Sequence, residues 1–158
     1  MRPLLLTAFC LVTAACATPI SVTEPPQSAA PEITLTKSLH FVSGDGSDLV
    51  VSPGTYAVQP GNGPRLELMS TFGIVADNRT LEAVSTNVGQ PVATPVALYI
   101  PWQDDEHHII FVQPSGAGLE AVGTGSGVRS RGLVPHPLPP DVVKKALSDY
   151  NARPLPQK

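Results

Sequence analysis

The sequence predicts a mainly β protein, an antiparallel β-sandwich or a partly open barrel, with one helix near the C-terminus. The 18 prolines and 13 glycines among 158 residues interrupt the chain too often for long helices. Between them, short segments alternate apolar and polar side chains, which is the period of a half-buried strand. A convincing helical spacing of apolar residues occurs late, over 141–150.

The first 15 residues have the order of a secretory signal peptide. Arg2 supplies a positive charge, and the run from Leu4 to Ala15 is apolar or small throughout. The alternative is a transmembrane anchor, but a spanning helix needs about 20 apolar residues, and Thr18 and Pro19 close this shorter run. We therefore expect residues 1–15 to be removed after export across a bacterial inner membrane.

The residues around Cys16 fit two cleavage reactions. Ala15, Cys16 and Ala17 form an A-x-A-like site for an ordinary signal peptidase. The segment from Thr13 to Cys16 resembles the lipobox of bacterial lipoproteins, from which it departs at Thr13, where leucine is usual. In such proteins the cysteine becomes the mature N-terminus and carries acyl chains, and each buried methylene adds about 0.8 kcal/mol to membrane binding.

The cysteine count favours the lipoprotein. Cys10 leaves with the leader, so Cys16 is the single cysteine of the mature chain and can form no intramolecular disulfide. We therefore predict a periplasmic lipoprotein of the cell envelope, anchored to a membrane by lipidation at Cys16. A soluble periplasmic or secreted protein is the alternative.

Three further segments follow the signal peptide. Residues 16–32 are mostly small, polar or proline, with little to bury, and predict a flexible linker that starts at the lipidated Cys16. The β domain is expected over 33–135, and the C-terminal helix and tail over 136–158. This length suits one folded unit.

Eight strands are expected along the β domain. The first, 33–42, alternates apolar and polar residues, with Lys37 as the exception on its apolar face. The glycine- and aspartate-rich segment 43–48 predicts a hairpin turn. The remaining expected strands are 49–51, 55–58, 65–69, 84–88, 96–100, 108–112 and 119–122.

The predicted helix starts after Pro139 and Pro140, since proline suits the first turn of a helix. Its apolar residues share one face, which is expected to cover a sheet edge or an open barrel end. These residues are Val142, Val143, Ala146, Leu147 and Tyr150.

The charge of the mature chain argues against a nucleic-acid partner. Removal of residues 1–15 takes away Arg2 and no other charged residue, so the formal net charge goes from −3 to −4. No block of basic residues occurs along the chain. Proteins that bind nucleic acid usually carry a basic patch that neutralises phosphates.

The densest group of ionisable residues runs from Asp104 to His108. Imidazole and carboxylate groups bind zinc, so Glu106, His107 and His108 are candidate metal ligands, and a metal-dependent periplasmic enzyme is the alternative function. Adjacent residues of a strand point to opposite faces, so both histidines could bind one ion only in irregular backbone. The simpler interpretation is a charged hairpin turn, with one histidine inward, one outward and no cofactor.

The glycine-rich stretch 123–132 contains Ser126, Arg129 and Arg131. Backbone N–H and guanidinium groups can bind phosphate or carboxylate, which makes these residues candidate ligands of an anionic glycan or phosphate. The stretch has neither the ending of a Walker loop nor the helix of a dinucleotide fingerprint. The alternative is a structural loop in which an arginine pairs with a carboxylate such as Glu106 or Glu120.

Four segments resemble a family of uncharacterised exported bacterial proteins with EHH and GVRSRG motifs. They are 53–58, 105–112, 119–123 and 126–132. The range from the first to the last of them, 53–132, is about half of the chain. The resemblance implies that the two clusters occur together, which favours a shared site or a mutual salt bridge. It implies no activity.

The sequence thus favours binding or structure over catalysis. Serine, histidine and aspartate are all present, but the G-x-S-x-G turn of a serine hydrolase is missing. We therefore predict a non-enzymatic protein of the cell envelope with a binding or structural role toward a protein or glycan.

Overall fold

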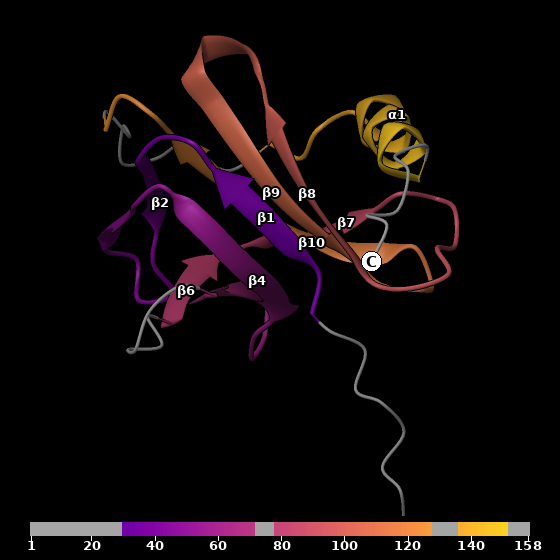
Figure 1. Ribbon diagram of the computed structural model, residues 1–158, viewed down its shortest axis with the longest axis horizontal. Coiled ribbons are helices and arrows are strands. Elements are labelled where there is room, and N and C mark those ends of the chain that lie inside the picture. Colours follow the sequence, from indigo (N-terminus) through magenta and orange to yellow (C-terminus); the bar gives the residue numbers. More distant parts are fainter. Residues whose placement is uncertain (1–29, 72–77, 128–135, 152–158) are drawn as a thin grey trace, which may run out of the picture.

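The computed structural model describes residues 30–71, 78–127 and 136–151, which form two antiparallel β-sheets and one α-helix (Figure 1). The predicted mainly β fold with a C-terminal helix is confirmed. The strands are β1 (Glu32–Leu35), β2 (Leu39–Val42), β3 (Asp48–Val51), β4 (Gly54–Pro60), β5 (Arg65–Ser70), β6 (Asn78–Glu82), β7 (Val84–Asn87), β8 (Val96–Pro101), β9 (Glu106–Val112) and β10 (Ala117–Thr124), and the helix is α1 (Pro140–Asn151).

The two sheets share one hydrophobic core. The first sheet has the strand order β1-β4-β5-β6, and the second has the order β3-β2-β10-β9-β8 with β7 beside β10. Buried side chains from both sheets meet between them, among them Ile33, Leu66 and Leu81 from the first and Phe41 and Ile109 from the second. This core holds the sheets together as the layers of a sandwich.

Backbone hydrogen bonds join the two sheets at one corner of the sandwich and not at the other. At the joined corner, the Gly44 N–H donates to the Thr80 carbonyl over 3.1 Å, and Ser43 forms an isolated bridge with Leu81. At the other corner, β1 and β8 are the outer strands of their sheets. The strands therefore do not close into a barrel.

The chain changes sheets between β1 and β2. β1 pairs with β4 in the first sheet, whereas β2 pairs with β3 and β10 in the second. The break falls at 36–38, where Lys37 interrupts the apolar face. The prediction of one strand over 33–42 is wrong because alternation records which side chains face the core, and this continues while the backbone turns a corner.

Helix α1 packs on the outer face of the second sheet. Val143 and Leu147 are buried there in a second apolar cluster with Leu98 and Ile110 of β8 and β9, next to Leu138 ahead of the helix. The helix therefore covers a sheet face rather than an open barrel end, and both faces of β9 are buried. Among the described residues, no helix has the length and apolar character needed to cross a membrane.

Candidate functional site

Strand β9 carries Glu106, His107 and His108 and directs the two histidines to opposite faces of the second sheet. His107 contacts Tyr99, whereas His108 contacts Glu120. The two side chains are only 5% and 1% exposed, because the sandwich core covers one face and α1 the other. Opposite directions are as predicted, but the expectation of one inward and one outward histidine is wrong, since both are buried.

The His107 side chain is held between a hydroxyl and a carboxylate. Nδ1 of His107 lies 2.8 Å from the Tyr99 hydroxyl, and the two rings are stacked. Nε2 lies 3.4 Å from Oδ1 of Asp105, which accepts a hydrogen bond of 3.0 Å from Lys37. A carboxylate beside Nε2 favours the proton on that nitrogen, so Nδ1 accepts from the Tyr99 hydroxyl.

The protonation states of this group are mutually consistent. The hydrogen bond from Lys37 is the main cause that lowers the pKa of Asp105 to about 2. Burial lowers the pKa of His107, helped by the charge of Lys37, and burial raises the pKa of Tyr99. At neutral pH the group therefore holds an ionised Asp105 and a neutral His107 and Tyr99.

A tight turn at Asp104 and Asp105 brings the Asp105 carboxylate within hydrogen-bonding distance of Lys37. Asp104 and Asp105 both have left-handed backbone, with φ of 57° and 60°, a conformation that aspartate tolerates better than most residues. Gly125 lies on the other side of the ion pair. A Cβ atom at that position would stand 2.6 Å from Nζ of Lys37 and 2.7 Å from Oδ1 of Asp105, so a larger residue there would displace the ends of these two side chains.

Replacing Lys37 with methionine should raise the pKa of Asp105 from about 2 toward its ordinary 3.8, because the main stabilising hydrogen bond is lost. With its low pKa, Asp105 stabilises the wild-type fold above about pH 4, and this stabilisation disappears as the pH falls toward 2. A carboxyl-carbon NMR titration measures the shift. Lys145→Met, which removes the exposed partner of Asp149, is the control and should leave Asp105 unchanged.

The His108 side chain belongs to a separate buried network. Its Nδ1 lies 2.7 Å from Oε1 of Glu120, and the backbone N–H of Leu138 donates to the same oxygen over 2.9 Å. Glu120 has no exposed surface, and Oε2 of Glu106 lies 3.4 Å from the other ring nitrogen. This network ties the segment ahead of α1 to the second sheet.

The predicted metal ligands do not converge on one point. Because His107 and His108 face opposite sides of the sheet, their ring nitrogens cannot meet at a single ion. In the described parts of the chain, no group of three or more histidine, cysteine, aspartate or glutamate side chains is placed to hold a metal ion.

Of the predicted anion-binding residues, Ser126 is described and exposed, next to the turn that carries Asp105. Arg129, Arg131 and the lipidation residue Cys16 lie outside the described residues. Glu120, one of the carboxylates considered as an arginine partner, bonds His108 and Leu138. The shared site and the mutual salt bridge of the two clusters stay predictions.

Sequence analysis missed the partners of the two histidines. Glu120 carries the clearest signal, because it interrupts an apolar strand, and a charged residue that is fully buried is nearly always paired. Lys37 carries a similar signal, since it interrupts an alternating pattern. The sequence carries no signal that Tyr99 contacts His107, because an aromatic residue is common in a core strand.

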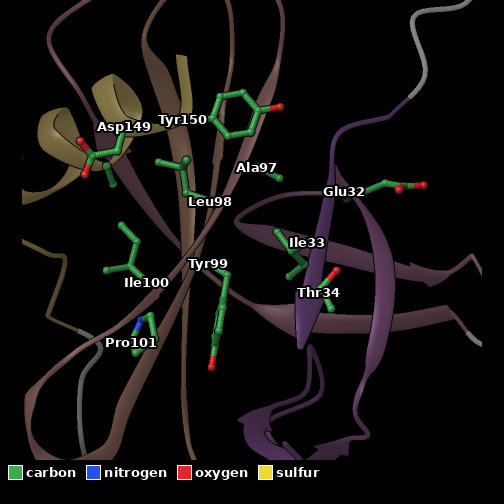
Figure 2. A pocket seen from close by; sticks show the side chains of 11 residues that line it. Glu32, Ile33, Thr34, Ala97, Leu98, Tyr99, Ile100, Pro101, Asp149 and Tyr150 are labelled. Carbon is green, nitrogen blue, oxygen red and sulfur yellow. The ribbon is translucent and has the colours of Figure 1, made fainter. Parts of the chain in front are cut away.

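A groove of about 470 Å³ follows the outer edge of β8 (Figure 2). β1 forms one side of it, and the last turns of α1 form another. The lining residues are Glu32, Ile33 and Thr34 from β1, Ala97 to Pro101 from β8, and Ala146, Asp149 and Tyr150 from α1. The groove lies at the corner of the sandwich where β1 and β8 come close to each other without pairing.

Comparisons with known proteins found no matching family, no matching curated protein and no matching solved structure. The resemblance to exported bacterial proteins therefore stays a prediction.

Proposed function

We propose that this protein is a non-enzymatic binding module of the cell envelope that holds its ligand in the groove along β8. The observation that carries the proposal is the groove itself, which lies where two sheet edges face each other and a helix ends. Pockets that combine apolar walls with a few polar groups are the usual form of a binding site. The lining of this groove has that composition.

The placement of the histidines favours binding over catalysis. A general base must come within hydrogen-bond reach of its substrate, and His108 is 1% exposed and bonded to Glu120, which also holds the segment ahead of α1. His107 is 5% exposed and already contacts Tyr99. Both side chains serve the packing of the second sheet in this arrangement.

We further propose that the module is periplasmic and anchored to a membrane through an acylated Cys16. The support comes from the sequence, with its short apolar leader, the segment TAAC and a single mature cysteine. The linker from Cys16 would join the domain directly at β1.

The anchor is tested by replacing Cys16 with serine. Wild-type protein in cells fed labelled palmitate should take up the label and sediment with membranes. The Cys16→Ser protein should take up no label and move to the soluble fraction. Equal labelling and equal sedimentation of the two proteins would contradict the anchor and leave the binding groove unaffected.

The groove is tested with a photo-crosslinking amino acid at Thr34, which is exposed on β1 and lines the groove. Val50, exposed on the opposite edge strand β3, is the matched control. Irradiation of cells that carry the full chain should give a discrete adduct from Thr34 and none from Val50. No adduct, or the same adduct from both positions, would contradict a binding role for this groove.

A further inference from the structure

The charged side chains that line the groove are engaged or directed away from it. Asp149 of α1 accepts a hydrogen bond of 2.9 Å from Lys145. On the β1 side, Figure 2 shows the Glu32 side chain directed away from β8. Recognition inside the groove therefore depends on its uncharged groups.

Tyr99 supplies an uncharged polar group next to the buried part of β8. Residues 96–98 of this strand are only 3–5% exposed, whereas Tyr99 is partly exposed and lines the groove. Figure 2 shows its side chain extending away from α1, with the hydroxyl at the far end. The hydroxyl of Thr34, on the facing strand β1, lies 3.2 Å from that of Thr55. The Tyr99 hydroxyl is thus a polar group that a ligand in the groove can meet.

The proton of this hydroxyl is committed to His107. The Tyr99 oxygen lies 2.8 Å from Nδ1 of His107, and Oδ1 of Asp105 lies 3.4 Å from the other ring nitrogen, Nε2. A neutral imidazole has one donor and one acceptor nitrogen, so the carboxylate keeps the proton on Nε2 and leaves Nδ1 as the acceptor. The Tyr99 hydroxyl therefore donates to His107 and offers only its oxygen lone pairs to any other partner.

The surroundings of His107 hold this arrangement at neutral pH. The hydrogen bond from Lys37 is the main cause that lowers the pKa of Asp105 to about 2, so Asp105 stays ionised beside Nε2. Burial lowers the pKa of His107, and among the charged groups around it Lys37 and His108 act in the same direction while Asp105 opposes them. The Tyr99 and His107 rings are stacked, with centroids 5.8 Å apart, which fixes the position of the hydroxyl.

We infer that Tyr99 is a specificity-determining residue of the groove, whose hydroxyl oxygen accepts a hydrogen bond from an uncharged O–H or N–H group of the ligand (Figure 2). This inference rests on the proposed binding function and names the ligand class, an apolar body that carries a neutral hydrogen-bond donor. Apolar surface from Ile100, Ala146 and Tyr150 matches such a body. A ligand that offers only an acceptor at this point would meet the oxygen lone pairs and be rejected.

The test uses the exported full chain with Cys16→Ser and two pairs of small probes, each a donor and its methylated counterpart. Cyclohexanol is compared with methoxycyclohexane, and N-methylbenzamide with N,N-dimethylbenzamide. Amide NMR shifts over 32–34 and 97–100 report binding in the groove, and titration gives the dissociation constants. Each donor should bind about two- to tenfold more tightly than its methylated counterpart, which is the net contribution of one hydrogen bond.

Two matched tyrosine variants locate the acceptor. Tyr99→Phe keeps the aromatic ring and removes the hydroxyl, so donor and methylated probe should then bind equally. Tyr150→Phe removes the hydroxyl of the exposed tyrosine at the rim and should leave the preference of the wild-type protein unchanged. Each preference compares two probes on the same protein, so a loss of stability in a variant does not produce the expected result.

Asp105→Asn tests how the hydroxyl is held in its role. Without the carboxylate, the charge of Lys37 favours a lone pair on Nε2 of His107, and the ring proton moves to Nδ1. Nδ1 then donates to the Tyr99 oxygen, and the hydroxyl proton turns away from His107. Nitrogen NMR shifts of the His107 ring should report the change of tautomer, and the preference for donors should fall.

The outcomes separate the two proposals. A donor preference in the alcohol pair, the amide pair or both supports the inference if Tyr99→Phe removes it, and the responding pair distinguishes O–H from N–H ligands. The inference is overturned if both pairs bind the wild-type protein without preference, if the preference survives Tyr99→Phe, or if no probe shifts the groove amides. It is also overturned if Asp105→Asn changes the tautomer and not the preference. The adduct at Thr34 decides the binding function separately, so an adduct without a donor preference keeps the function and removes the role of Tyr99.

Discussion

Replacing Glu120 with alanine is expected to lower the free energy of unfolding by about 2–5 kcal/mol, because each buried donor left without an acceptor costs about 1–3 kcal/mol. The change leaves two groups without their acceptor, Nδ1 of His108 and the N–H of Leu138. Neither can reach water, because Glu120 lies under the segment that leads into α1. Urea unfolding at pH 7 measures the loss.

Two further variants isolate the cause. Glu120→Gln keeps a side-chain oxygen for the Leu138 N–H and should cost less than the alanine change. Glu82→Ala removes the same type of side chain from an exposed position and should stay within about 0.5 kcal/mol of wild type. A Glu120→Ala loss below about 1 kcal/mol would show that this network does not hold the segment to the sheet.

Replacing Leu147 with alanine should lower the free energy of unfolding by about 2–5 kcal/mol, because it opens a cavity beneath α1. Leu147 has no exposed surface and packs with Val143 against the outer face of the second sheet. The loosened helix also carries one wall of the groove, so the crosslinked adduct at Thr34 should decrease as well. Amide hydrogen exchange over α1 reports the loosening directly.

The matched control for this change is Ser148→Ala, one residue further along and exposed. It should change stability by no more than about 0.5 kcal/mol. Faster exchange in α1 for Leu147→Ala and not for Ser148→Ala is the expected result. Unchanged exchange in both would mean that the helix is held mainly by other contacts, such as the network at Glu120.

Much of the fold follows from local features of the sequence. Proline and glycine mark many of the strand ends, so the turn at 43–48 and the strands on either side could be predicted from a few neighbouring residues. The assignment of strands to sheets depends on contacts far apart in the chain. In the alternation the crossing at 36–38 is marked by Lys37 alone, because β1 and β2 present the same set of alternate residues to the core on either side of it.

The same division applies to the two histidines. Their opposite directions follow from strand geometry alone, but the burial of His108 depends on the segment around Leu138 that leads into α1, which comes late in the chain. Glu120 is 12 residues from His108, and Lys37 is 68 residues from Asp105. Such pairs arise from strand register and sheet order, and a single sequence specifies neither locally.

Because the linker from Cys16 leads directly into β1, its length limits the distance between Cys16 and the groove. Glu32 is 16 positions after Cys16 in the sequence, and a fully extended chain of that length spans at most about 55 Å. If Cys16 is acylated as proposed, this linker limits how far the β1 wall of the groove can lie from the membrane. A ligand of the groove must then approach within roughly the same distance of the bilayer, so partners that stay farther from the membrane cannot reach it.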